Sequence, residues 1–262
     1  MTALDLETIA VRQADGVAWL TLNRPQTLNA WTLQLGRELT RALDDAAHDD
    51  GVRAIVLTGA GRAFSSGADL RERAGDDADV GSALERVYNP LIMRVRTLPK
   101  PVIAAVNGPA VGIGCSLALA CDLIVAARSA YFLMAFVNVG LGLDGGASQT
   151  LIARVGHARA FEIAYLGDRI AAEQALAWGL VNQVADDDKL EACAAALAAR
   201  LATGPPRSFA AIKRTLNHRA YDGFEQLLAL EAEVQRSLLV SGDFAEGVTA
   251  FLQKRPARFT GA

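Results

Sequence analysis

Two glycine-containing segments, residues 64–70 and 108–115, lie where a strand is expected to give way to a helix. Such a junction exposes backbone N–H groups, which carry partial positive charge and can stabilise an oxygen atom that becomes negative during a reaction. Glycines at these junctions serve packing more often than catalysis, so their spacing alone leaves both interpretations open. Neither segment ends in Gly-Lys-Ser/Thr, as a P-loop does. In the second segment, Gly112-Ile113-Gly114 is not followed by the third glycine that the dinucleotide-binding pattern G-x-G-x-x-G requires. We therefore expect neither type of phosphate loop.

Asp144 is the one carboxylate within a long apolar segment, residues 132–146, that follows these turns. Burial among apolar groups raises the pKa of an aspartate toward the range in which it can accept and return a proton. The residues alone favour a simpler interpretation, in which Asp144 caps the N-terminus of a helix that begins near Ala147. The segment therefore offers one candidate acid/base group and no second carboxylate beside it.

Cysteine and histidine add little further chemistry. The three cysteines, Cys115, Cys121 and Cys193, contain no CxxC spacing, and the three histidines are far apart in the chain. Neither a disulfide framework nor a metal site is expected from these patterns. Cys115 is the last residue of the second of these segments, but with no histidine near it we expect a small core residue. We predict no metal and no prosthetic group, so any reaction must depend on carboxylates, backbone amides or an external cofactor.

These groups must be positioned by an α/β framework, with strands mainly in the first half of the chain and helices in the second. Apolar patterns predict a β-hairpin around the turn Ala14-Asp15-Gly16. The strands are expected over residues 6–12, 17–22, 54–58, 102–107 and 123–127. Apolar residues at helical spacing predict the helices, the first of which has Thr32 as its N-cap. The helices are expected over residues 32–47, 81–97, 113–120, 147–155, 157–166, 171–178, 187–202, 206–217, 224–240 and 244–254.

Composition and charge exclude several classes of protein. The chain has 262 residues, of which 52% are hydrophobic, and a net charge of −3 from 26 basic and 29 acidic residues. Such a chain can bury a large core and also area between subunits, and it offers no basic field for a nucleic acid. Residues 101–143 are very apolar, yet polar residues and glycines interrupt them too often for a membrane span. Residues 1–16 lack the basic start and apolar core of a secretory signal, so we expect a cytoplasmic protein.

Several short motifs occur in a fixed order along nearly the whole chain. The motifs are Thr21-Leu22-Asn23-Arg24-Pro25, Leu28-Asn29-Ala30, Ala63–Leu70, Asn107-Gly108, Gly112-Ile113-Gly114-Cys115, residues 171–175 and 179–181, Glu246-Gly247 and Phe251-Leu252. In this order and spacing they resemble the crotonase, or enoyl-CoA hydratase/isomerase, superfamily. The resemblance implies an α/β fold of the ClpP/crotonase type, with a core of repeated ββα turns and a helical C-terminal region used for trimerisation. Residues 1–203 would form the core with the CoA site and active site, and residues 204–262 the oligomerisation region.

Members of this superfamily bind the carbonyl oxygen of a coenzyme A (CoA) thioester with two backbone amides, and the matching residues are Ala68 and Ile113. Glycine is usual at the second position, but an isoleucine there keeps the backbone N–H that acts as the donor. The resemblance also implies that CoA, as part of the substrate, lies along two segments of the chain. The matching residues are Arg24, Leu28, Ala30, Ser66, Asp69 and Leu70. For Asp69, a role as a helix cap or loop-fixing carboxylate is an equal alternative.

The hydratases of the superfamily use two glutamates to position and activate water, and the matching residues here are Ser116 and Phe136. Neither side chain can transfer a proton as a carboxylate does, so water addition by that route is not expected. The segment around Asp144 and the C-terminus resemble the phenylacetate-degradation isomerases. These enzymes convert 1,2-epoxyphenylacetyl-CoA to an oxepin-CoA and can shift enoyl double bonds. The resemblance implies that Asp144 is the acid/base group of an acyl-CoA isomerase.

Two alternatives stay open: an enoyl-CoA hydratase with rearranged acid/base groups, and a non-catalytic homologue that binds acyl-CoA. Members of the superfamily are typically trimers or paired trimers. The expected partners are therefore an acyl-CoA substrate and further copies of this chain, as a homotrimer or a dimer of trimers. No nucleic acid and no membrane are expected.

Overall fold

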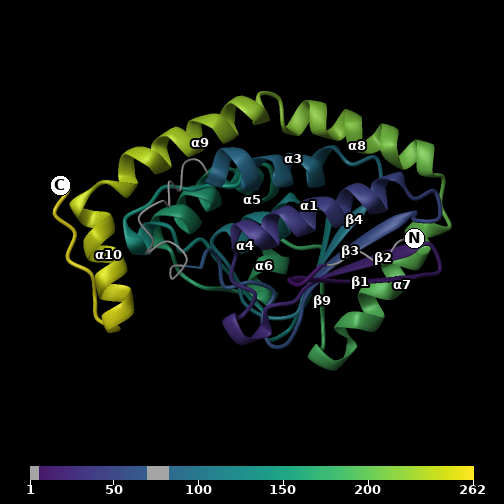
Figure 1. Cartoon of the computed structure of the whole chain (residues 1–262), viewed down its shortest axis with the longest axis horizontal. Coiled ribbons are helices and arrows are strands. Elements are labelled where there is room, and N and C mark those ends of the chain that lie inside the picture. Colours follow the sequence, from purple (N-terminus) through teal and green to yellow (C-terminus); the bar gives the residue numbers. More distant parts are fainter. Residues whose placement is uncertain (1–5, 70–82) are drawn as a thin grey trace.

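A six-stranded sheet forms the centre of the computed structural model, which describes residues 6–69 and 83–262 (Figure 1). In spatial order the strands are β1 (Ile9–Ala14), β2 (Val17–Leu22), β3 (Ala54–Gly59), β4 (Val102–Val106), β6 (Leu123–Ala127) and β9 (Gln183–Ala185). β1 and β2 form an antiparallel hairpin, and the later neighbours are parallel. The five predicted strands are all present, and β9 is an additional edge strand that the sequence pattern did not indicate.

Local chemistry explains the hairpin and the first helix. Asp15 and Gly16 have φ values of 51° and 78°, the left-handed conformation that a two-residue hairpin turn of type I′ requires. The helix α1 (Leu33–His48) begins after Thr32, whose hydroxyl oxygen accepts a hydrogen bond from Leu35 N–H at 3.1 Å. The predicted N-cap is therefore confirmed.

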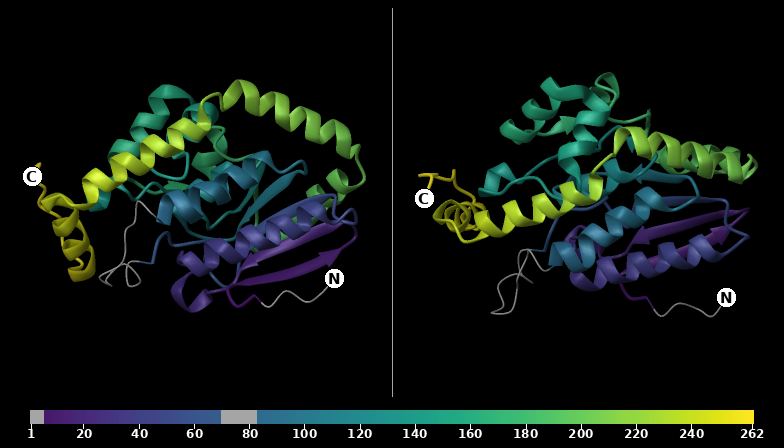
Figure 2. Two further views of the ribbon diagram at one scale, coloured as in Figure 1. Left: turned by 45° about the horizontal axis from the view of Figure 1, so that its top comes forward. Right: turned by 90° about the horizontal axis from the view of Figure 1, so that it is seen from above.

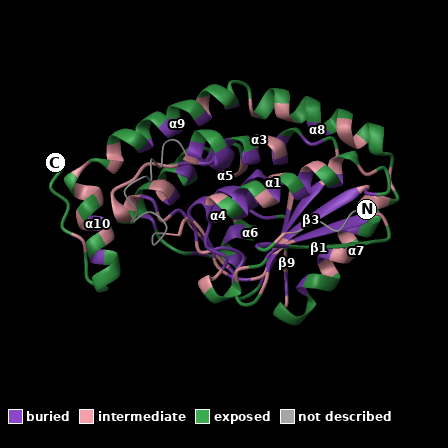
Figure 3. Ribbon diagram, in the orientation of Figure 1, coloured by how far each residue is buried: buried purple, intermediate pink, exposed green. Residues whose placement is uncertain are grey.

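Helices cover both faces of the large sheet. α1 packs against β1 and β2 and is flanked by α3 (Asn89–Thr97), which continues from the short π-helix η3 (Leu84–Tyr88). α7 (Leu190–Ala202) packs on the opposite face, below the strands in Figure 1. The central strands are consequently buried, whereas the outer faces of the helices are exposed (Figure 3). The predicted helix over residues 81–97 is confirmed in its described part, and residues 81 and 82 lie outside the described ranges.

A second sheet of three short strands was not expected from the sequence. It contains β5 (Ala110–Val111), β7 (Tyr131–Leu133) and β8 (Ile170–Ala171), with β5 parallel and β8 antiparallel to β7. Strands of two or three residues are too short to show an alternating pattern, so only long-range pairing defines them. β5 leads into α4 (Ile113–Ala120), whose bounds match the prediction. The second glycine-containing segment therefore forms the junction between this sheet and α4.

Helices dominate the second half of the chain, as predicted. Besides α7 they are α5 (Ala147–Leu166), α6 (Ala172–Ala177), α8 (Pro206–Ala220), α9 (Phe224–Leu239) and α10 (Gly242–Gln253). α5 breaks at Gly156, which has φ 74° and ψ 170°, and this explains why the sequence pattern indicates two helices there. α8 and α9 run along the outside of α3 and α5, and α10 turns away at the far end (Figure 2). Within the described ranges, no helix is long and apolar enough to span a bilayer.

Candidate active site

The two glycine-containing segments lie side by side in the structure. Ser65 N–H donates to Pro109 O at 3.0 Å, and Ser65 O accepts from Val111 N–H at 2.9 Å. On the other edge of the first segment, Trp31 N–H donates to Gly67 O at 2.8 Å. Backbone hydrogen bonds thus fix the relative positions of two turns that are distant in the sequence.

Two glycines make this close approach possible. A Cβ on Gly67, whose φ is 90°, would lie 3.0 Å from Val111 O. A Cβ on Gly114 would lie 2.5 Å from the Cβ of Ser65. A side chain at either position would therefore push the turns apart. The packing and functional interpretations of these glycines are compatible, because the packing is what brings the backbone amides together.

The backbone N–H groups of Ala68 and Ile113 border the space beside these turns. In the parallel bridge between Ala68 and Trp31, the hydrogen bonds are made by Gly67 O and Asp69 N–H. The N–H of Ala68 itself therefore points away from Trp31. Ile113 is the first residue of α4, and the first N–H groups of a helix have no acceptor within that helix. Both residues line the same cavity. The structure therefore brings the two predicted amide donors together.

A cavity of about 330 Å³ opens beside the turns, within the size range of small-molecule sites. Its lining residues are Ser66, Gly67, Ala68, Val111, Gly112, Ile113, Tyr131, Leu133, Ala135, Phe136, Asn138, Val139, Leu141, Asp144, Arg169 and Phe251. Most of these side chains are apolar. Among the described residues that line the cavity, Asp144 is the carboxylate and Arg169 the cation. The cavity suits a ligand with an apolar part, which would contact these side chains, and a carbonyl group, which would accept hydrogen bonds from the two amides.

Asp144 lies in this cavity and is nearly buried, with 4% of its surface exposed. Its carboxylate accepts a hydrogen bond from Gln235 Nε2 at 3.3 Å. The simpler interpretation, that Asp144 caps the following helix, is wrong. Glu231 accepts hydrogen bonds from the N–H groups of Gly146 and Ser148 at the start of α5, at 2.7 and 3.0 Å. A carboxylate from another helix provides the cap, and the Asp144 side chain faces the cavity instead.

Ser116 and Phe136 occupy the two positions that correspond to the hydratase glutamates. Ser116 is fully buried in α4, and its hydroxyl donates to the backbone carbonyl of Asp144 at 2.9 Å. Phe136 is 7% exposed and lines the cavity, and its ring edge would lie 3.9 Å from a Cβ on Gly112. The serine therefore holds the turn that carries Asp144, and the phenylalanine forms an apolar wall. Neither side chain can transfer a proton as a carboxylate does.

The segments predicted to contact CoA come together next to the cavity. The predicted contacts within the described residues are Arg24, Leu28, Ala30, Ser66 and Asp69, and Leu70 lies outside them. Ser66 borders the cavity, and its N–H donates to Leu28 O at 2.9 Å. Arg24 forms an ion pair with Asp69 at 3.1 Å and donates to Ala30 O at 2.6 Å. The ion pair with Arg24 is the kind of contact that a loop-fixing Asp69 makes, and the CoA contact of this residue stays a prediction.

The C-terminal helices supply site residues that were not predicted. Glu231 and Gln235 come from α9, and Phe251 of α10 lines the cavity. A signal for the first two was present in the sequence, because α9 buries Leu228 and Ala232 at helical spacing and the two polar residues lie on the same buried face. Residues beyond 203 therefore contribute to the site together with the core.

Arg169 was also missed. It precedes β8 and stacks on the ring of Tyr131, with its guanidinium carbon 4.6 Å from the ring centroid. No local pattern marks such a residue, because the short strands β7 and β8 bring the two side chains together.

Cysteine chemistry has no support in the structure. Burial raises the pKa of Cys115 to about 12, and that of Cys121 to about 12 as well. Thiols with such pKa values are almost wholly protonated near neutral pH and are poor nucleophiles. Over residues 6–69 and 83–262, no group of three or more His, Cys, Asp or Glu side chains is placed to hold a metal ion.

Two adjoining sheets, and a cavity in which two backbone amides accompany one carboxylate, define this protein as an α/β protein of the crotonase type. A family model described as enoyl-CoA hydratase/isomerase matches residues 12–262. The chain belongs to this family.

Individual relatives carry both isomerase and hydratase names. The chain is 44% identical over 260 residues to the 1,2-epoxyphenylacetyl-CoA isomerase of Escherichia coli (strain K12), covering 98% of this chain and 99% of that protein. It is 43% identical over 258 residues to a probable enoyl-CoA hydratase of Rhodobacter capsulatus, covering 98% and 100% of the two chains. A solved enoyl-CoA hydratase from Mycobacterium avium subsp. paratuberculosis K-10 has a TM-score of 0.88 and 40% identity, covering 97% of this chain and 99% of that chain. The predicted fold class and superfamily are confirmed.

Proposed function

We propose that this protein is an acyl-CoA isomerase in which Asp144 moves one proton between two carbons of the acyl group. The observation that carries the proposal is the composition of the cavity. Among its described lining residues Asp144 is the one carboxylate, and it shares the cavity with the amides of Ala68 and Ile113. One acid/base group suffices for a 1,3-shift, because the group that takes the proton also returns it.

The proposed reaction begins with the thioester carbonyl oxygen between the N–H groups of Ala68 and Ile113. With a 3-enoyl-CoA, Asp144 takes a proton from C2, and the electron pair forms a dienolate whose negative oxygen the two amides stabilise. The protonated Asp144 then returns the proton to C4, while the double bond moves to C2–C3. A single preorganised donor of this kind lowers the barrier by about 3 kcal/mol. No cofactor is consumed.

The proposed substrate carries an unsaturated acyl group or a ring epoxide. The similar E. coli protein is named a 1,2-epoxyphenylacetyl-CoA isomerase. Apolar lining residues such as Leu133, Phe136 and Leu141 suit an alkenyl or aromatic group. An enoyl-CoA hydratase is the second candidate, because the R. capsulatus relative carries that name.

We also propose that CoA follows residues 24–30 and 66–69, and that the chain assembles as a homotrimer or a dimer of trimers. Large apolar side chains that are exposed in the single chain support assembly, since such surfaces mark interfaces. Those more than half exposed are Tyr165, Leu166, Ile212, Leu216, Leu230, Val240, Phe251 and Leu252. Analytical ultracentrifugation tests the assembly, and a monomer at micromolar concentration would contradict it.

Asp144→Asn tests the proposed acid/base role. The substitution keeps the size of the side chain and removes proton transfer, so isomerase kcat on 3-enoyl-CoA and 1,2-epoxyphenylacetyl-CoA is expected to fall by at least about 100-fold. Products are identified by mass spectrometry and absorbance. Activity within about threefold of the unmodified protein would contradict the assignment. Asp186→Asn, on an exposed aspartate that pairs with Arg128 and Lys189, is the matched control.

Crotonyl-CoA separates the alternatives. Hydration at a rate comparable to isomerisation would favour a hydratase over an isomerase. Tight binding of CoA esters, with no conversion of any enoyl or epoxide substrate, would instead indicate a non-catalytic binding protein.

A further inference from the structure

The helix α9 reaches Asp144 through a buried amide. Gln235 is 2% exposed, and its Nε2 donates to Gly142 O at 2.8 Å and to Asp144 Oδ2 at 3.3 Å. Because both partners are acceptors, the nitrogen of the amide must face them. Gln235 therefore contacts both the backbone and the carboxylate of the turn that carries the proposed acid/base group.

One turn earlier on α9, Glu231 holds the other side of the same turn. Its two carboxylate oxygens each accept one backbone N–H, from Gly146 and from Ser148. Burial raises the pKa of Glu231, and the hydrogen bonds from Ser148 and Gly146 oppose that effect. The carboxylate satisfies the first amides of α5, which are the groups that Asp144 would otherwise be placed to cap.

Placing two polar side chains on a buried helix face is costly and calls for an explanation. α9 buries Leu228 and Ala232 beside them, so apolar residues would pack well at the same positions. Within the described ranges, no donor reaches the buried Oε1 of Gln235. A buried amide that is only partly satisfied is uncommon in folded proteins and calls for an explanation beyond packing.

We propose that Gln235 is a positioning residue for the isomerase reaction. Its amide holds the ionised Asp144 carboxylate in place at the cavity, while Glu231 provides the helix cap and leaves that carboxylate available. This inference rests on the proposed function of Asp144. It assigns part of the catalytic geometry to the C-terminal helices.

The hydrogen bond from Gln235 has a definite electrostatic consequence. A donor to a carboxylate favours its ionised form, so loss of the amide raises the pH needed to ionise Asp144. The other charged or titratable groups described around the cavity and the turn are Glu231 of α9, Arg169 before β8 and Tyr131 of β7. A variant at Gln235 leaves all three in place, so a change in the pH profile reports on the lost hydrogen bond.

Gln235→Met tests the proposal, because methionine has a similar length and no amide. Loss of one hydrogen bond to a charged group should lower kcat about tenfold, leave KM within about twofold, and move the acidic limb of the pH–kcat profile up by about one unit. A purely structural role predicts a lower melting temperature and a smaller active fraction, with the acidic limb unchanged. That second result would overturn the proposal.

Gln235→Glu provides an independent test if the methionine variant folds poorly. A second carboxyl beside Asp144 disfavours ionisation of both groups, so the acidic limb should move further up than in Gln235→Met. Gln226→Met is the matched control, since Gln226 is an exposed glutamine on the same helix. An unchanged acidic limb in a folded Gln235→Glu variant would also overturn the proposal.

The two hypotheses fail in different ways. If Asp144→Asn is inactive but the Gln235 variants keep the normal pH profile, the proposed function stands and the positioning role is wrong. If Asp144→Asn keeps its activity, the proposed function itself is wrong.

Discussion

The backbone polar groups at the two ends of α4 differ in their hydrogen-bond partners. At the N-terminal end, the N–H of Ile113 borders a cavity large enough for a ligand. At the C-terminal end, Arg154 donates to the carbonyls of Leu119 and Cys121 at 3.1 and 2.6 Å. Arg96 donates to Ala120 O at 2.8 Å. Protein side chains therefore satisfy one end of the helix, while the other faces a space in which a substrate can bind.

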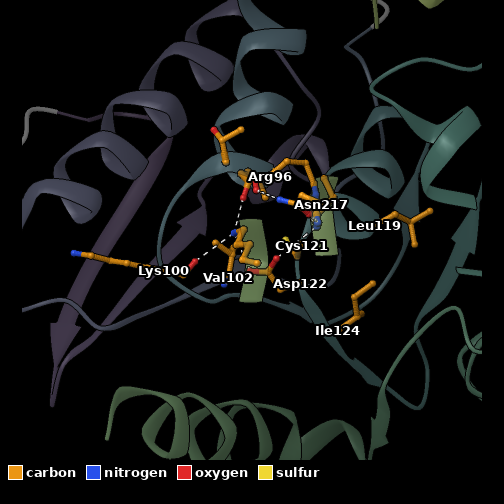
Figure 4. Close-up of polar contacts among 12 residues, drawn as sticks. Arg96, Lys100, Val102, Leu119, Cys121, Asp122, Ile124 and Asn217 are labelled. Atoms are coloured by element: carbon orange, nitrogen blue, oxygen red, sulfur yellow. Dashed lines mark hydrogen bonds and ion pairs between the residues drawn. The ribbon is translucent and has the colours of Figure 1, made fainter. Parts of the chain in front are cut away.

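A largely buried ionic cluster lies at the C-terminal end of α4, where the backbone groups are satisfied (Figure 4). Asp122 lies 2.9 Å from Lys213 Nζ and 3.5 Å from Arg96, which also donates to the side chain of Asn217. Burial lowers the pKa of Lys213, and the charge of Asp122 opposes that effect. Since Lys213 and Asn217 belong to α8, the cluster also attaches the C-terminal helices to the core.

The difference between the two ends of α4 separates a region that contributes mainly to stability from a region that can bind a ligand. Buried backbone groups are almost always paired, so a helix end that faces a cavity is a site where a ligand can supply the missing partner. The cations at the other end suit the negative pole of the helix and leave little room for a ligand. Changes at the C-terminal end should therefore affect stability, and changes at the N-terminal end should affect catalysis.

The largest effect on stability is expected from Asp122→Asn. The variant leaves Arg96 and Lys213 buried without their counter-charge, which should lower the free energy of unfolding by about 3 kcal/mol. Urea denaturation measures this change. Asp186→Asn, at an exposed aspartate, should leave the midpoint almost unchanged. A normal midpoint with a large loss of kcat in Asp122→Asn would contradict the division between the two ends.

Ile113→Pro should reduce catalysis about as strongly as Asp144→Asn, and it should also cost some stability because it shortens a side chain that is only 2% exposed. Proline is tolerated at the first position of a helix, but it lacks the N–H that would bind the thioester oxygen. We expect kcat to fall about 100-fold, as for the loss of one oxyanion donor elsewhere. Ile113→Val keeps the N–H and should remain close to the unmodified enzyme. Equal losses in both variants would show that the side chain, and not the amide, is important.

Glu231→Gln is expected to have a smaller effect, which is a change in how the free energy of unfolding depends on pH. Burial raises the pKa of Glu231 above its ordinary value of 4.5 in the folded state. Between the unfolded and folded pKa values the folded state binds more protons, so this group makes the free energy of unfolding fall as pH rises through that window. Glu231→Gln should remove this fall. Urea denaturation at a series of pH values above 4.5 measures it, and identical slopes in the two proteins would contradict the prediction.

Thiol labelling compares the two ends of α4 without any mutation. Cys115 lies in the first turn and Cys121 follows the last, and burial raises the pKa of each to about 12. At pH 8 these thiols are almost wholly protonated, so iodoacetamide should modify the partly exposed Cys193 first. Mass spectrometry identifies the labelled peptide. Rapid labelling of Cys115 would show that the N-terminal end of α4 opens to solvent.

Most of the regular elements could be predicted because their signals are local. The Asp15-Gly16 turn, the Thr32 cap and the apolar periodicity of α1 depend on residues that are neighbours in the chain. The short strands β5, β7, β8 and β9 could not be predicted, because two or three residues carry no period and only a distant partner makes them strands. The same limit concealed Arg169, which these strands bring to the cavity.

The sequence by itself determined the superfamily, the positions of Ala68 and Ile113, and the loss of both hydratase glutamates at Ser116 and Phe136. These are properties of residue type and order. Only the tertiary structure decided what Asp144 faces. From the residues alone a cap of α5 was the simpler interpretation, because an aspartate near a helix start has a local use. A glutamate almost ninety residues later, on α9, takes that cap, so a long-range hydrogen bond leaves Asp144 at the cavity.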